Sequence, residues 1–344
     1  MKKLILLLIL IVISCEKKQE LTVPQTFVGN AIGTTYGIKA FHDVPLELTE
    51  DIDAIIDMFN QSMSTWVPGS DINRINDGDS TVVVGKAFKE VFDAAQEIYR
   101  KTDGYFDPTV GNLVNAYGFG ANGEQTNIPS QKQIDSLLQF VGFYKMDIQK
   151  TAIDEGYHVT TTQPGMYLEY NAIAKGTLVD YIARMLDKKG VENYIVEVGG
   201  EVITKGENLE KDAPFLVGIN DPKSGAQGTK TLMAINLEDK AMAGSGNYRK
   251  YKVDEATGIE YVHTVNPITG LAQPSQVIGV NVIANNCTLA DGYATALMAM
   301  PLEKSRVLLK NIPEIEVIIM YIDDNGMLRF ELTPGFNQYI KPQI

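Results

Sequence analysis

The apolar residues of this chain change repeatedly between strand-like and helix-like spacing, without a regular strand–helix–strand order. Strand patterns occupy residues 34–40, 194–198, 215–219, 232–237, 240–244, 277–283, 316–322 and 327–332. Helices are expected at residues 50–60, 86–102, 129–140, 174–189, 288–300 and 303–311. A parallel sheet needs a crossover helix between successive strands, so this irregular order favours an α+β fold.

Local signals refine this outline. Folded structure is expected to start near Phe27, and the strand at 34–40 is expected to have a return strand near Glu47. Short strands are expected within 144–161. The sequence Asp-Asp-Asn-Gly at 323–326 is typical of a hairpin turn. With 344 residues, the chain can form one large domain or two intimate lobes.

The charge balance limits the partners of the protein. The formal net charge is −13, and beyond the N-terminal tip no cluster of lysines or arginines offsets it. Proteins that bind a phosphate backbone need a basic surface, so nucleic acid is excluded as a partner. The chain has two cysteines, Cys15 and Cys287, in such different contexts that a disulfide between them is not expected.

The N-terminus has the pattern of an export signal. A basic start and an apolar run to Ile13 precede Ser14 and Cys15, and the run is too short for a transmembrane helix. This pattern indicates a lipoprotein signal peptide at 1–14, lipidation of Cys15, a flexible tether at 15–26 and a folded domain at 27–344. The lipid would anchor the protein to a membrane. The alternative is an ordinary cleaved signal peptide with an incidental cysteine.

Short segments rich in Gly, Asp, Thr and Asn interrupt the apolar sequence. They are residues 33–36 (GTTY), 104–109 (GYFDPT), 172–176 (AIAKG), 244–248 (GSGNY), 263–270 (HTVNPITG) and 290–296 (ADGYATA). Any one of them alone is weak support for a functional site, because turns use the same residues for backbone reasons.

One pair of side chains has the spacing of a cation site. Asp291 and Thr295 are four positions apart on an expected helix, so their oxygens share one face. A carboxylate and a hydroxyl can supply part of a hard-cation site, completed by carbonyls, water and phosphate oxygens. The alternative is an N-cap aspartate and a threonine that bonds its own helix backbone.

Other residues leave two interpretations open. His263 lies on a loop after a strand, where it could move a proton or simply pack. Lys175 begins a helix, where it could hold phosphate or be solvated. Residues 199–200, a Gly-Gly pair after a strand, could admit a close neighbour or form a tight turn. His42 and His158 are expected to be structural.

Taken in order, these segments resemble the FAD:protein FMN transferase (ApbE) family. The family pattern has a Met-Gly-Thr start, a Ser-Thr-Tyr loop, Gly-x-Phe-Asp-x-Thr, Ile-Ala-Lys-Gly, a Gly-Gly strand end, Ser-Gly-x-Tyr, His-x-x-x-Pro-x-Thr-Gly and Ala-Asp-x-x-Ala-Thr-Ala. The matching segments run from about residue 32 to residue 296. The resemblance implies an ApbE-like single large domain of mixed sheets and helices in two intimate lobes.

The resemblance also implies roles for individual residues. Asp291 and Thr295, with the backbone carbonyl of Ala172, would bind Mg²⁺. His263 and Asp291 would be catalytic. The contacts to FAD would come from Ile32, Trp66, Tyr105, Phe106, Asp107, Glu169, Lys175 and Val265. Here FAD is a substrate rather than a resident cofactor.

The chain departs from the family pattern at several positions. Ile32 stands where methionine is usual, and Trp66 where tyrosine is usual. Glu169 and Tyr170 stand where Asp and Leu are common. Asn266 replaces a common aspartate. None of these positions is an implied metal ligand.

The activity implied by the resemblance is Mg²⁺-dependent transfer of FMN from FAD to a threonine or serine hydroxyl of an acceptor redox protein, with release of AMP. One alternative is a metal-dependent FAD hydrolase, and another is a non-catalytic flavin-binding lipoprotein. The expected location is the periplasmic face of a bacterial membrane, with the inner membrane favoured. An unrelated solute-binding lipoprotein would need two similar lobes around a hinge, and the sequence has no such pattern.

Overall fold

The computed structural model describes residues 23–122, 128–152, 155–224, 230–247, 251–255 and 257–341. The expected signal peptide, the lipidation site Cys15 and most of the expected tether lie outside these ranges. In the described part of the chain, no helix has the length and apolar character needed to cross a membrane.

An eight-stranded sheet forms the centre of the domain, in the order β1-β2-β5-β6-β9-β12-β13-β14. Its strands are β1 (Gln25–Ala31), β2 (Thr34–Phe41), β5 (Asn193–Val198), β6 (Glu201–Lys205), β9 (Ala241–Gly246), β12 (Val277–Ala284), β13 (Glu316–Ile322) and β14 (Leu328–Leu332). Each neighbouring pair is antiparallel. The α+β fold class predicted from the sequence is therefore confirmed, in a single domain.

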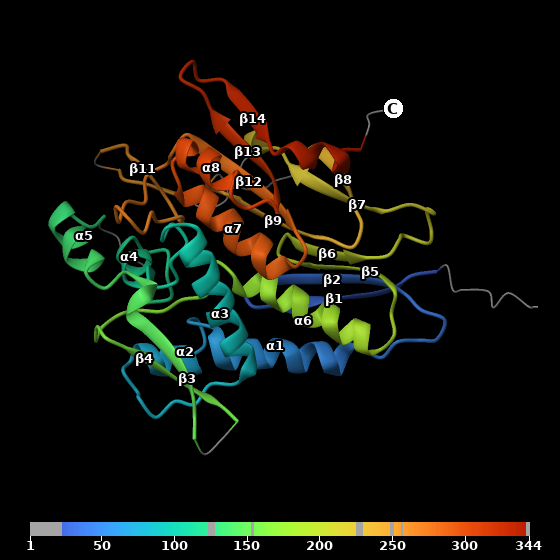
Figure 1. The fold of residues 1–344 in the computed structure, drawn as a ribbon, viewed down its shortest axis with the longest axis horizontal. Coiled ribbons are helices and arrows are strands. Elements are labelled where there is room, and N and C mark those ends of the chain that lie inside the picture. Colours follow the sequence, from blue (N-terminus) through green and yellow to red (C-terminus); the bar gives the residue numbers. More distant parts are fainter. Residues whose placement is uncertain are drawn as a thin grey trace, which may run out of the picture.

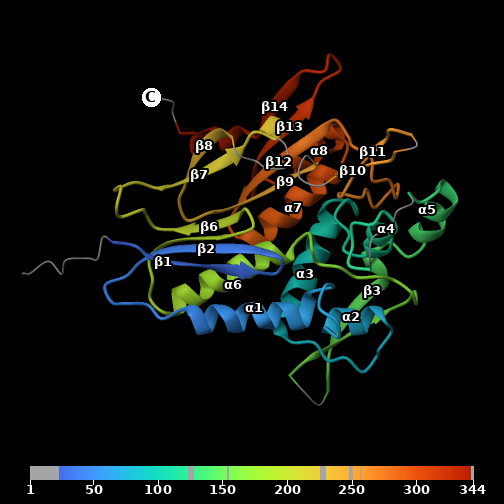
Figure 2. The ribbon, with the colours of Figure 1, turned by 180° about the vertical axis from the view of Figure 1, so that it is seen from behind.

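Both faces of the sheet are covered. In Figure 2, strands β1, β2 and β6 lie between helices α1 (Thr49–Met63) and α6 (Ala174–Lys188) on one side and the hairpin of β7 (Phe215–Asn220) and β8 (Thr231–Leu237) on the other. Side chains of β13 alternate accordingly, because Val317 and Ile319 join the helix-side core whereas Ile318 and Met320 join the hairpin-side core. This two-sided burial explains the continuous apolar run of β13.

The helix-side core also contains α3 (Lys86–Lys101) and α7 (Cys287–Ala299). Helices α6 and α7 lie along the same side of the sheet (Figure 1) and contact each other. The remaining helices are α2 (Asp71–Asn76), α4 (Gly111–Ala116), α5 (Gln131–Leu138) and α8 (Leu302–Leu309).

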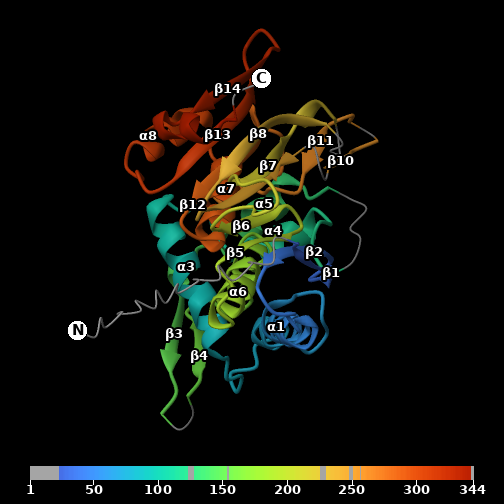
Figure 3. The ribbon, with the colours of Figure 1, turned by 90° about the vertical axis from the view of Figure 1, so that its right-hand side faces the viewer.

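Two small hairpins complete the fold. The hairpin of β3 (Met146–Lys150) and β4 (Tyr157–Thr161) projects from the body (Figure 3). The hairpin of β10 (Tyr251–Val253) and β11 (Glu260–Val262) joins α4 and α5 around a separate apolar cluster that includes Tyr117, Tyr261 and Val265.

The prediction of a return strand near Glu47 is wrong. Strand β2 pairs with β1 on one side and with β5 on the other. The segment around Leu46 is irregular, and its polar groups are satisfied by the side chain of Gln25. That amide accepts from the Leu46 N–H at 2.6 Å and donates to the Val44 carbonyl at 2.9 Å. The first strand of the described residues begins at Gln25, two residues before the expected Phe27.

Candidate functional site

Two adjoining cavities lie at one end of α6. The first has a volume of about 290 Å³ and the second about 640 Å³. Asn171 and Lys175 line both cavities, so the two spaces meet at the start of α6.

The predicted site residues gather around these cavities from distant parts of the chain. Those lining the first cavity are Tyr105, Phe106, Asp107, Glu169, Ala172, Lys175, His263, Val265, Asp291 and Thr295. Ile32, Trp66 and Lys175 line the second. Every implied FAD-binding and metal-binding residue therefore lines one of two cavities that share Asn171 and Lys175.

The three implied metal ligands lie together at the α6–α7 contact. Asp291 is buried in the second turn of α7, and its Oδ2 accepts from the Gly176 N–H at 3.0 Å. Thr295 Oγ1, one turn later, lies 3.4 Å from the Ala172 carbonyl oxygen. The N-cap of α7 is Asn286, whose side chain accepts from the Leu289 N–H, so the N-cap interpretation of Asp291 is wrong.

The donor set of this corner consists of a carboxylate, a hydroxyl and a carbonyl oxygen. Such hard oxygen ligands suit Mg²⁺, which usually takes one or two carboxylates and completes its shell with water and substrate phosphate. Among the described residues, no group of three or more His, Cys, Asp and Glu side chains is arranged to hold a metal. A cation held by these three oxygens would complete its shell with water or substrate oxygens.

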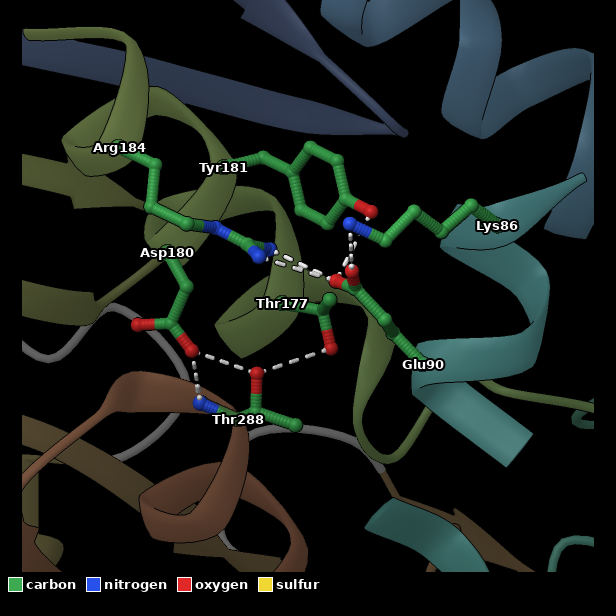
Figure 4. Close-up of polar contacts among 7 residues, drawn as sticks. All are labelled: Lys86, Glu90, Thr177, Asp180, Tyr181, Arg184 and Thr288. Carbon is green, nitrogen blue, oxygen red and sulfur yellow. Dashed lines mark hydrogen bonds and ion pairs between the residues drawn. The ribbon is translucent and has the colours of Figure 1, made fainter. Parts of the chain in front are cut away.

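Tertiary hydrogen bonds fix α7 against α6. The carboxylate of Asp180 on α6 accepts from the backbone N–H of Cys287 at 2.8 Å. It also accepts from the Thr288 N–H at 2.9 Å and from the Thr288 hydroxyl at 2.5 Å (Figure 4). A side chain of one helix thus satisfies the free amides at the start of the next. This arrangement fixes the position of the Asp291 face of α7.

Helix α3 is joined to the same pair. One oxygen of Glu90 accepts from the Tyr181 hydroxyl at 2.9 Å and from both terminal nitrogens of Arg184 at 3.0 Å (Figure 4). Helices α3, α6 and α7 are therefore joined by charged and neutral hydrogen bonds as well as by apolar packing.

Glu201, a residue not predicted from the sequence, contacts Lys175 where the two cavities adjoin. The ammonium of Lys175 lies 2.6 Å from Oε1 of Glu201, whose side chain is only 1% exposed. Glu201 follows the turn of Gly199 and Gly200, which joins β5 to β6 with φ values of 60° and 105°. The Gly-Gly pair is thus a tight turn, and Gly199 also forms part of the second cavity wall.

His263 faces the first cavity directly after β11. It shares this wall with Ser245 and Gly246 at the end of β9. These two residues belong to the Ser-Gly-x-Tyr segment of the family pattern, to which the sequence assigned no individual role. The other two histidines lie elsewhere and bond backbone carbonyls, His158 to Val82 at 2.9 Å and His42 to Val44 at 3.2 Å. Both fit the structural role expected for them.

The carboxylate of Asp107 holds its own loop together. It accepts from the N–H and the hydroxyl of Thr109 at 2.8 and 2.5 Å, and from the Phe143 N–H at 3.2 Å. Burial raises the pKa of Asp107 to about 6, because the loss of hydration outweighs these hydrogen bonds. Its side chain therefore shapes the cavity wall as much as it offers a contact to a ligand.

We expect Asp107 to make stability fall as pH rises. Its pKa is higher in the folded than in the unfolded chain, so its contribution is complete below the unfolded value of 3.8 and is lost as pH rises through about 6. Between pH 5 and 7 the loss is about 1 kcal/mol. Urea unfolding at both pH values should show this loss relative to Asp107→Asn; an equal pH dependence in both proteins would contradict it.

Trp66 lies at the rim of the second cavity with 58% of its surface exposed. Ile32, on the same wall, has a φ of 38°, so a branched side chain occupies a left-handed turn position that disfavours it. Gly33 follows with φ 81°, completing the turn between β1 and β2. An exposed indole over a cavity is well placed to stack on a flat heterocycle.

Comparison with known proteins assigns the family. The ApbE family model matches residues 32–319. The chain is 31% identical over 328 residues to an FAD:protein FMN transferase of Vibrio cholerae, covering 94% of each protein. It is 29% identical over 298 residues to the protein of the same name from Escherichia coli K12, covering 86% of this chain and 82% of that one.

Solved structures agree in fold. The flavin transferase ApbE from Vibrio cholerae has a TM-score of 0.80 at 29% identity, covering 92% of this chain and 99% of that one. The flavinyl transferase ApbE of Pseudomonas stutzeri has a TM-score of 0.78 at 26% identity, covering 93% and 98%. The fold is thus that of a flavin transferase scaffold. This chain belongs to the ApbE family.

Proposed function

We propose that the protein is an FAD:protein FMN transferase, which moves FMN from FAD to a threonine or serine hydroxyl of an acceptor redox protein. The observation that carries this proposal is the convergence of Asp291, Thr295 and the Ala172 carbonyl beside His263, at one end of two connected cavities. The names of the relatives, FAD:protein FMN transferase, support the same reaction.

The cavities fit the parts of FAD. An elongated dinucleotide needs two pockets for its two ring systems and a polar junction for the pyrophosphate that links them. Trp66 and Tyr105 offer aromatic surfaces in the second and first cavities, respectively. Lys175 faces both cavities and can approach phosphate oxygens between them.

Asp291, Thr295 and the Ala172 carbonyl are the groups that would hold Mg²⁺. When bound, the cation would neutralise charge on the phosphates and act as a Lewis acid. Asp291 also remains bonded to the Gly176 N–H, which keeps its carboxylate oriented.

The proposed reaction is a phosphoryl-type transfer. The acceptor hydroxyl oxygen forms a bond to the FMN phosphorus, the bond from that phosphorus to the bridging oxygen breaks, and AMP leaves with the electron pair. The imidazole of His263 would accept the hydroxyl proton. Burial of Asp291 and the apolar walls limit water at the reacting phosphorus.

The same proposal places the protein at the periplasmic face of the inner membrane. Cleavage before Cys15 and its acylation would leave residues 15–26 as a tether between the lipid and the folded domain. An exported location brings the enzyme to exported redox proteins as acceptors. Membrane fractionation with mass spectrometry of the N-terminal peptide tests this; an unmodified, soluble mature chain would contradict it.

The decisive experiment mixes the full-length protein in detergent with FAD, Mg²⁺ and a redox subunit purified without its flavin. The expected result is an FMN-sized mass gain on the subunit and an equal amount of AMP. Release of AMP and free FMN with no modified subunit would identify a hydrolase instead. Bound FAD with no AMP would identify a flavin-binding protein.

Replacement of Trp66 by alanine is expected to weaken FAD binding about 10-fold, the contribution of one aromatic stacking contact. Because the side chain is exposed, the stability of the fold should change by no more than about 0.5 kcal/mol. Flavin fluorescence titration measures the affinity. Trp66→Tyr is the matched control and should retain binding; equal affinity of the alanine variant would remove Trp66 from the site.

A further inference from the structure

Lys175, which lines both cavities, forms an ion pair with Glu201 of the central sheet. Lys175 is in the first turn of α6, and Glu201 is the first residue of β6. Their charged atoms are 2.6 Å apart. The lysine side chain is 30% exposed, facing the cavities, whereas the glutamate side chain is 1% exposed.

The charges around this pair are predominantly negative. Among the described residues that line either cavity, Lys175 is the only lysine or arginine, and the carboxylates are Asp107, Glu169 and Asp291. The Lys175 ammonium, the one fixed cation among these described lining residues, therefore lies against a buried anion. A dianionic pyrophosphate would enter a space with no surplus of positive charge from these side chains.

We infer that Glu201 is a positioning residue that holds the Lys175 ammonium at the junction and cancels its charge, so that binding of FAD depends on a divalent cation. This inference rests on the proposed function, because it takes FAD as the ligand. It assigns to Glu201 a part in substrate selection that acts through Lys175 and not through contact with FAD.

A buried carboxylate loses its hydration and needs a nearby cation to stabilise its charge. Glu201 lies away from water, so its charge is stabilised by the nearby ammonium. In turn the carboxylate fixes the direction of a flexible side chain and reduces its attraction for a second anion. Removing the Glu201 charge would take away the negative charge 2.6 Å from the Lys175 ammonium and so strengthen its attraction for FAD in the absence of metal.

Two variants should shift the metal dependence in opposite directions. Glu201→Gln keeps the shape and removes the charge, so FAD should bind about 10-fold more tightly than to the wild type in EDTA. Lys175→Met leaves the buried anion, so FAD should bind about 10-fold more weakly in EDTA. Glu201→Asp keeps the charge on a shorter side chain, so the ratio of affinities with and without Mg²⁺ should stay as in the wild type.

The measurement is the FAD dissociation constant, in EDTA and in saturating Mg²⁺. Trp66 is the single tryptophan of the chain and lines the second cavity, so quenching of its emission reports binding without any turnover. Thermal unfolding of each variant gives the folded fraction. If Glu201→Gln does not fold, Lys175→Met and Glu201→Asp still test the charge argument.

The expected result is a smaller Mg²⁺ effect in Glu201→Gln and a larger one in Lys175→Met. An unchanged Mg²⁺ effect in both, with FMN transfer by the wild type intact, would overturn this inference alone. A wild type that neither changes its Trp66 emission with FAD nor releases AMP from it would overturn the proposed function, and this inference with it.

Discussion

Replacement of Asp291 by asparagine is expected to lower the rate of FMN transfer by about 10²- to 10⁴-fold. The substitution removes the only carboxylate of the proposed ligand set. It also leaves an oxygen that can still accept from the Gly176 N–H, so the helix contact is retained. The rate is measured as AMP released and acceptor mass gained at saturating FAD and Mg²⁺.

The matched control is Asp324→Asn in the turn between β13 and β14. This exposed carboxylate bonds the Gln276 side chain and lines neither cavity. Its variant should transfer FMN at the wild-type rate. If Asp291→Asn retains more than about a tenth of the wild-type rate, the residue is not a ligand needed for catalysis.

Replacement of Gly176 by alanine is expected to destabilise the fold by about 3 kcal/mol or more. A Cβ at this position would lie 2.3 Å from the Cys287 carbonyl oxygen and 2.8 Å from the Asp291 Cβ. Backbone atoms of a buried helix cannot move aside cheaply, so α6 and α7 must separate. Urea unfolding of the variant gives the free energy, and its midpoint should fall.

Gly37→Ala is the control for this prediction. Its added methyl group would have only the flexible Glu197 side chain near it, at 3.8 Å. We expect a neutral or slightly positive change in stability there, because alanine reduces the freedom of the unfolded chain. Equal stabilities of the two alanine variants would show that the α6–α7 contact tolerates separation.

The long periodic elements could be predicted from the sequence. Helices α1, α3, α6, α7 and α8 lie within a few residues of the expected ranges, because each combines an apolar stripe with clear ends. The hairpin of β13 and β14 follows from its turn residues. The fold class also follows, since irregular order is a property of the whole sequence.

The elements missed were short or exposed. Strand β1 has an alternating but weakly apolar pattern, with Val28 at 73% exposure, as is typical of a sheet edge. Strand β6 has five residues and begins directly after the Gly-Gly turn. Helices α2 and α4 have six residues each, too few for a periodic signal.

Motif resemblance identified candidate ligands but not their supports. Glu201 has no local pattern that indicates burial, because its partner Lys175 is on another element brought close by the turn of β5 into β6. Asp180 looks like any polar residue of an amphipathic helix, yet it caps α7. Only tertiary structure shows such partners, since each depends on two elements meeting.

Helix α7 places the candidate catalytic carboxylate on a mostly buried element of the domain. Its buried residues are Cys287, Ala290, Asp291, Gly292, Tyr293, Ala294, Ala296, Leu297, Met298 and Ala299, and it contacts α3, α6, β9 and β12. Amides of such a helix exchange with solvent mainly when the whole domain opens. The candidate metal ligand Asp291 should therefore stay in place for as long as the domain is folded, whereas the exposed side chain of Trp66 can be replaced at little cost to folding.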